Sequence, residues 1–222
     1  SGDGTSTAAG GKNINIGNLT HLTGPYTGKA ISIGYNQNRG AASTSSGAYG
    51  GNAVAIGYKT GVHYSSNSVK IGYNHNFNRA NCVAVGNSVN ITANYGVAIG
   101  NNASSIYGGY YGAVAIGERA YAIAGGVSIG KHAGQGYGDS RRNYTSSAGL
   151  GSISIGRYSS VVGRNDIAIG YKASTEKKDG SNTTGSVAIG HNVRTREQGL
   201  IEIGFWSDRS TRKVGLRLHG IQ

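Results

Sequence analysis

Several residue types that build ordinary protein cores are scarce in this chain of 222 residues. It has no methionine, one proline (Pro25), one cysteine (Cys82) and two phenylalanines (Phe77 and Phe205). Compact globular cores draw heavily on Leu, Phe and Met, so a core of the usual enzyme type is not expected. A single cysteine excludes an intrachain disulfide and leaves the redox compartment open. No stretch approaches the roughly 20 apolar residues of a membrane-spanning helix.

The residues that are abundant indicate an ordered chain rich in strands. Glycine occurs 40 times and tyrosine 15 times, without the proline or the Gly-X-Y period of collagen. The apolar residues are mostly Val, Ile and Ala, which favours strands over helices. The net charge of +12 suggests attraction to polyanions, and a solvated, mildly basic surface explains it equally well. The chain has neither a signal peptide nor an initiator methionine, so we expect a segment of a longer protein.

A short motif, [IV]-x-[IV]-Gly, recurs along the chain. Successive glycines are most often 14 residues apart, with insertions between some units. The twelve motif glycines are Gly17, Gly34, Gly57, Gly72, Gly86, Gly100, Gly117, Gly130, Gly156, Gly170, Gly190 and Gly204. A fixed short period of this kind is typical of solenoids.

Each unit is predicted to form two short strands joined by turns. Alternation along a strand places Val114 and Ile116 on one face and Ala115 on the other, and we expect the Val and Ile side chains to fill the interior. Gly117 supplies the backbone freedom for a sharp corner, with a positive φ. Stacked in parallel, such units form a thin β-solenoid with about twelve 14-residue coils and loop insertions.

The middle position of the motif is small in most units. Nine of its twelve residues are Ala or Ser. A solvent-facing strand position usually carries larger polar residues, so we expect this face to pack against a second copy of the chain. Asn15 and Glu202, in the first and last units, would mark where that packing ends. Lys70 is an anomaly here, because like charges near a symmetry axis repel.

The repeats resemble a known family. The stretches NAVAIGYKT, YGVAIGNNA, GAVAIGERAYAIAGGVSIGKHA and GSVAIGHNV look like the head repeats of YadA-type trimeric autotransporter adhesins. The resemblance covers roughly residues 13–207 and implies a left-handed parallel β-roll, assembled as an intertwined or side-by-side homotrimer. Bacteriophage tail fibres carry the same repeat, so the resemblance is more specific for fold than for biology.

Three departures favour the fibre over the adhesin. The chain is basic, rich in Tyr and Asn, and has insertions of unequal length. No neck motif follows the last unit, and the tail FWSDRSTRKVGLRLHGIQ (205–222) looks more like the exit of a fibre into its next domain. Some adhesin heads bind collagen, but this property cannot be transferred to this chain, because the motif linked to it is also the repeat that forms the fold. We divide the chain into an N-terminal lead-in (1–12), the β-roll head (13–207) and a C-terminal exit segment (208–222).

Motifs for catalysis are largely missing from the sequence. The nine acidic residues are scattered, with no pair spaced for work on a glycosidic bond. The six histidines form no metal-ligand cluster and are interpreted as surface or stacking residues. Cys82 is interpreted as a small packing residue. We therefore expect that the chain has no enzymatic activity and binds no cofactor or metal. A glycan depolymerase is the less favoured alternative.

Recognition is predicted in the long insertions, because loops on a rigid scaffold commonly carry binding. Tyrosine offers a rigid apolar face with a hydroxyl, and Arg grips carboxylates or phosphates. The candidate receptor- or glycan-binding residues are Tyr107, Tyr110, Tyr111, Tyr137, Arg141, Arg142, Tyr144, Lys177 and Lys178. Four tyrosines directly after a motif glycine are instead expected to cover exposed coil edges: Tyr35, Tyr58, Tyr73 and Tyr171.

Together these features predict a trimeric, extracellular attachment module. The first hypothesis is a virion tail-fibre segment that binds a bacterial surface polysaccharide or an outer-membrane protein receptor. The alternative is the head of a bacterial adhesin, on the outer-membrane surface, that binds host extracellular matrix or cells. Neither nucleic-acid binding nor membrane insertion of this segment is expected.

Overall fold

The structure, a computed structural model, is built entirely of β-strands in the part of the chain that it describes. These residues are 6–7, 14–17, 22–23, 31–35, 52–60, 66–75, 77, 79–106, 112–134, 151–175, 183–206 and 213–219. The prediction of an all-β chain is confirmed for them. No helix long and apolar enough to cross a membrane occurs among them.

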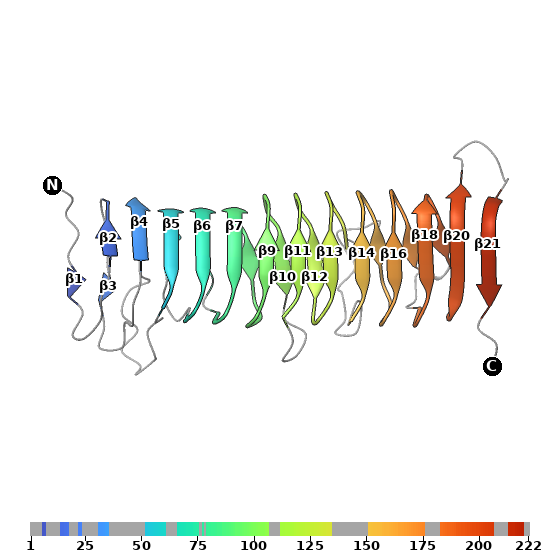
Figure 1. Cartoon of the computed structure of the whole chain (residues 1–222), viewed down its shortest axis with the longest axis horizontal. Coiled ribbons are helices and arrows are strands. Elements are labelled where there is room, and N and C mark those ends of the chain that lie inside the picture. The colour runs from blue at the N-terminus through green and yellow to red at the C-terminus, as the bar shows by residue number, and fades with distance from the viewer. Residues whose placement is uncertain are drawn as a thin grey trace, which may run out of the picture.

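The repeated motifs lie side by side in one long parallel sheet. Its strands are β2 (Ile14–Ile16), β4 (Ile31–Tyr35), β5 (Val54–Tyr58), β6 (Val69–Tyr73), β7 (Val83–Asn87), β9 (Val97–Ile99), β11 (Val114–Ile116), β13 (Val127–Ile129), β14 (Ile153–Ile155), β16 (Ile167–Ile169), β18 (Val187–His191) and β20 (Leu200–Trp206). A thirteenth strand, β21 (Lys213–His219), pairs antiparallel with β20. Figure 1 shows the strands following one another along the long axis, with β21 reversed.

Shorter strands form a second wall behind this sheet. They are β8 (Asn90–Ile91), β10 (Ser104–Ile106) and β12 (Tyr121–Ile123) in one sheet, β15 (Ser160–Val161), β17 (Ser174–Thr175) and β19 (Arg194–Thr195) in another, and the pair β1 (Ser6–Thr7) and β3 (Leu22–Thr23). The result is a parallel β-solenoid of about eight turns, as predicted at the level of architecture. The total of twelve coils, the left-handed sense and the trimer stay predictions.

Equivalent motif residues stack in register from coil to coil. Val97 pairs with Val114 and Ala98 with Ala115, and the same one-to-one register holds between neighbouring motif strands from β4 to β20. The motif glycine is required by this stacking. At Gly86, φ is 136°, and a Cβ atom would overlap the carbonyl oxygen of Gly100 in the next coil. Only a residue without Cβ fits this corner.

The prediction of which side chains fill the interior is wrong. The middle residues of the motif, such as Ala84, Ala98 and Ala115, are fully buried, whereas the flanking Val and Ile residues are only partly buried. Ala and Ser therefore line most of the interior at this position, and Lys70 and Glu202 are the larger residues buried at the same position in their own coils. Ala115 therefore faces the inside of its own coil and does not face a partner chain.

The second wall completes this small-residue core. The third residue after a motif glycine is buried in nine of the described coils: Thr60, His75, Val89, Ala103, Ala120, Ala133, Ser159, Ala173 and Val193. Interior serines are satisfied by backbone carbonyls, as Ser105 Oγ donates to Ala113 O at 2.9 Å and Ser152 Oγ donates to Gly163 O at 2.7 Å. These hydroxyls are tolerated inside because each finds an acceptor, whereas the buried hydroxyls of Ser160, Thr175 and Thr195 have none among the described residues.

Candidate binding surfaces

The binding residues predicted in the insertions cannot be placed. They lie outside the residues that the structure describes: Tyr107, Tyr110, Tyr111, Tyr137, Arg141, Arg142, Tyr144, Lys177 and Lys178. Their assignment as receptor- or glycan-binding residues stays a prediction. Three other surfaces of the solenoid are described, and one buried cluster.

The outer side of the long sheet presents a continuous stripe of aliphatic side chains, which we call the Val/Ile face. It is formed by the first and third motif residues, and Ile71 and Ile203 are 37% and 42% exposed. Strand β21 extends it, because Leu216 pairs with Ile203 and is 54% exposed. A long, contiguous aliphatic surface of this kind typically marks an interaction site.

One long edge of the solenoid is formed by the two residues that follow each motif glycine, which we call the corner row. A ladder of backbone hydrogen bonds fixes it: the amide of the second residue donates to the carbonyl of the first residue one coil earlier. Nine such bonds, of 2.8–3.4 Å, run from Lys59 N→Tyr35 O to Asn192 N→Tyr171 O. The second residue has a positive φ at most coils, for example 56° at His132.

Aromatic rings stack along the corner row in two groups. Tyr35, Tyr58 and Tyr73 stack with centroids 5.6 and 5.0 Å apart. A longer group joins five rings at 5.3, 6.2, 5.1 and 4.9 Å: His132, Tyr158, Tyr171, His191 and Phe205. Its rings are stacked except at Tyr158 and Tyr171, which meet edge to face. The expectation that tyrosines after a motif glycine cover the coil edges holds for these positions. In addition, the register between neighbouring coils brings these rings into contact with one another.

Cations stand beside these rings. Lys59 Nζ lies 5.3 Å from the Tyr58 ring centroid, Arg157 Cζ 4.9 Å from Tyr158 and Lys172 Nζ 5.2 Å from Tyr171. The Arg157 guanidinium donates to Tyr158 Oη at 3.5 Å, and this hydrogen bond lowers the pKa of the Tyr158 hydroxyl. The row therefore combines rigid rings with positive charge at fixed intervals.

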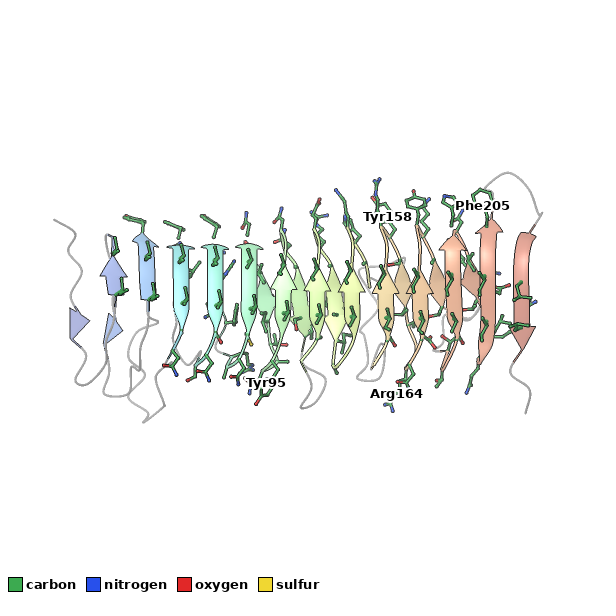
Figure 2. All side chains as sticks on the ribbon, viewed as in Figure 1. Tyr95, Tyr158, Arg164 and Phe205 are labelled. Carbon is green, nitrogen blue, oxygen red and sulfur yellow. The ribbon has the colours of Figure 1, made fainter. Side chains whose placement is uncertain are left out.

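The opposite edge has a different, amide-rich chemistry. Asn52 Nδ2 donates to Asn67 Oδ1 and Asn67 Nδ2 donates to Asn81 Oδ1, both at 3.2 Å. Tyr95 is 65% exposed on this edge, and Figure 2 shows Tyr95 and Arg164 pointing away from the side on which Tyr158 and Phe205 lie. The two edges therefore differ in the series of neighbouring rings, which only the corner row forms among the described residues.

Lys70 occupies the buried middle position of β6. Its Nζ donates to Phe77 O at 2.6 Å and lies 4.2 Å from the centroid of the Phe77 ring. Burial lowers the pKa of Lys70 to about 7, and the nearby Cys82 acts weakly in the opposite direction. The prediction that Lys70 lies near a symmetry axis is wrong, because the side chain is 1% exposed inside its own coil.

Two more titratable groups share that coil. His75 is buried and its Nε2 lies 2.8 Å from Gly86 O, and burial lowers the pKa of this imidazole. Cys82 is buried, as predicted for a small packing residue, with Sγ donating to Ala80 O and Ala93 O. Burial raises the pKa of the Cys82 thiol. His132 and His191 are stacking residues as expected, whereas His75 is an interior residue.

The acidic residues of the described part of the chain are all engaged by partners. Glu118 pairs with Lys131 at 2.7 Å, and Arg217 pairs with Glu197 at 2.6 Å. Arg217 Nε also lies 3.6 Å from Glu202, which is buried. Glu202 was expected to mark the end of the packing, but strand β21 continues the sheet beyond it. Asp166 is buried and accepts hydrogen bonds from Thr183 Oγ1 and from Ser186 N. No group of three metal-ligating side chains occurs in these ranges.

Comparisons with known proteins give no relative: no family model, curated protein or solved structure matches the chain. The fold and the surfaces described above therefore carry the functional argument.

Proposed function

We propose that this chain is a segment of a non-enzymatic, homotrimeric attachment fibre that recognises a bacterial surface glycan or an outer-membrane receptor. The observation that carries the proposal is the Val/Ile face. The aliphatic residues that the motif repeats most strictly lie on the outside of the coil, half-buried in the single chain. Covering them with further copies supplies the apolar burial that a core of Ala and Ser does not.

The number of copies is taken from the resemblance to the YadA-type head, in which three rolls lie side by side. A closed symmetric assembly covers the same stripe on every chain and leaves none exposed. Arg217 lies between Leu216 and Leu218 on β21 and opposite the buried Glu202, so its side chain points away from the stripe and does not oppose the contact there. The partner is therefore proposed to be a second and a third copy of this chain.

A passive role suits the rest of the chain. Backbone hydrogen bonds tie the coils together, and the described acids form ion pairs or hydrogen bonds with neighbouring residues of the scaffold, which supports a structural role for them. The repeats serve as a scaffold from which insertions leave, and the proposed location is extracellular, on a virion tail fibre. The alternative remains the head of an outer-membrane adhesin that binds host matrix or cells.

Binding to intact cells separates these two roles. The labelled protein is incubated with a panel of Gram-negative bacteria, before and after removal of their surface polysaccharide, and in parallel with matrix-coated surfaces and cultured animal cells. A fibre segment binds some of the bacteria, and an adhesin head binds matrix or animal cells instead. Binding to none of these targets contradicts an attachment role. Shortening of purified capsule or lipopolysaccharide would overturn the non-enzymatic assignment.

A further inference from the structure

The corner row carries positive charge that the proposed assembly does not use. From Glu118 to Phe205, the described residues of the row include four cations, Arg119, Lys131, Arg157 and Lys172, and one carboxylate, Glu118. Lys131 pairs with that carboxylate. The row lies beyond the motif glycines, so it is separate from the Val/Ile face.

The geometry of the row is fixed before any ligand arrives. The backbone ladder ties each coil to the preceding one, with bonds of 2.8–3.0 Å at His132, Tyr158, Lys172 and Asn192. Neighbouring parallel strands lie about 4.8 Å apart, so charged groups and rings recur at roughly this interval along the solenoid axis. Because the backbone and the rings of the row are already ordered, binding a ligand costs less conformational entropy than it would on a flexible surface.

We propose that the corner row from Glu118 to Phe205 binds an acidic polysaccharide that lies along the solenoid axis. This inference rests on the proposed attachment function and names its ligand class. Arg157 and Lys172 would bind carboxylates or phosphates of successive sugars, because guanidinium and ammonium groups form charge-assisted hydrogen bonds with such anions. The Tyr158 and Tyr171 hydroxyls, at the outer ends of their rings, would bind sugar hydroxyls.

The stacking of the rings favours a glycan over single-stranded nucleic acid. Proteins that bind single strands stack bases on open aromatic faces. Here His132 covers one face of Tyr158 at 5.3 Å, and His191 lies against Tyr171 at 5.1 Å. A base cannot enter between rings at this spacing, so the row offers hydroxyl edges and cations, which suit an acidic sugar chain.

The test compares two double variants of equal charge loss. Arg157→Gln with Lys172→Gln removes two cations from the corner row, and Arg164→Gln with Arg196→Gln removes two exposed cations elsewhere. Arg164 points to the opposite edge (Figure 2). The probes are polygalacturonate as the acidic glycan, dextran as the neutral one and poly(dT) as the nucleic acid, each measured at low and physiological salt.

The unmodified protein is expected to bind polygalacturonate, more weakly at higher salt, and to bind dextran and poly(dT) poorly. The corner-row variant should lose about tenfold in affinity, and the control variant about twofold or less. Equal losses in both variants would show that binding depends only on net charge, and this would overturn the inference. Preferential binding of poly(dT) would overturn it as well.

Failure of this inference can be told apart from failure of the attachment function. If the corner-row variant still binds bacteria and polygalacturonate as the unmodified protein does, while Tyr110→Ala with Tyr111→Ala abolishes binding, recognition lies in the insertions. The corner-row assignment is then wrong and the attachment function stands. If the unmodified protein binds neither cells nor any glycan, both are wrong.

Discussion

Replacing the buried Lys70 with methionine should remove a pH dependence of stability that this side chain creates. Burial lowers the pKa of Lys70 from 10.5 to about 7. Between these two values the unfolded chain binds a proton that the folded chain does not, so the free energy of unfolding rises with pH. The limiting slope is about 1.4 kcal/mol per pH unit, and integration from pH 7 to 8.5 gives a gain of about 1.5 kcal/mol.

Neighbouring groups define this pH window. The pKa of His75 is lowered by burial from 6.5, so its contribution also rises with pH but levels off about one unit above 6.5, and little of it falls within the window. The pKa of Cys82 is raised by burial from 9.0, so the unfolded chain loses this proton first and stability falls above about pH 9. Between pH 7 and 8.5, Lys70 therefore dominates among the three groups.

Urea unfolding at half-unit steps from pH 7 to 8.5, at one protein concentration, measures the effect. The unmodified protein should gain stability across the series, and Lys70→Met should give a nearly flat profile, since methionine fills a similar volume without a charge. Lys59→Met is the matched control, because Lys59 is exposed on the corner row, and it should keep the slope. A flat profile for the unmodified protein, or an unchanged slope in Lys70→Met, would refute the account of this residue.

Two further predictions concern packing. Gly86→Ala should destabilise the chain by at least about 3 kcal/mol, because a Cβ would overlap Gly100 O at a positive φ. Gly199→Ala, whose Cβ would meet nothing within 4 Å, should cost only the backbone strain of its φ of 66°, about 1–2 kcal/mol, in the same urea titrations. Equal losses at the two glycines would contradict the close stacking of the corners. Ala98→Leu should cost about 1–3 kcal/mol, because the side chain is fully buried between the two walls, whereas Ile99→Leu on the outer face should change little. The reverse order would place the interior on the other side of the sheet.

The sequence was enough to predict the strands, because the period of 14 and the alternation within each motif depend on local chemistry. Which face of the strand is the interior was not predictable from alternation alone. Val114 and Ile116 are larger than Ala115, and the rule that large apolar residues are buried favoured the wrong face. The deciding factor is the second wall of each coil, which covers Ala115 and its equivalents, Lys70 included, and leaves the Val and Ile side chains outside.

The corner row was only partly visible in the sequence. Tyr35, Tyr58 and Tyr73 follow motif glycines directly, so their alignment could be read from the repeat. The longer stack could not, because Tyr158 is the second residue after its glycine and Tyr171 is the first after the next, yet their rings meet at 6.2 Å. The ring thus changes from the second to the first position after the glycine between adjacent coils, so no single column of the aligned repeat contains the whole group.

The molar mass in solution tests the central claim most directly, since that claim assigns the Val/Ile face to contacts between copies. Static light scattering after size exclusion should give about 68 kDa, three chains of 22.7 kDa, for the unmodified protein. Ile71→Glu with Ile203→Glu, which places charges on the Val/Ile face, should shift the mass toward 22.7 kDa, whereas Tyr95→Glu at the opposite edge should not. A stable monomer of the unmodified protein in dilute solution, or a trimer that both variants leave intact, would contradict the account.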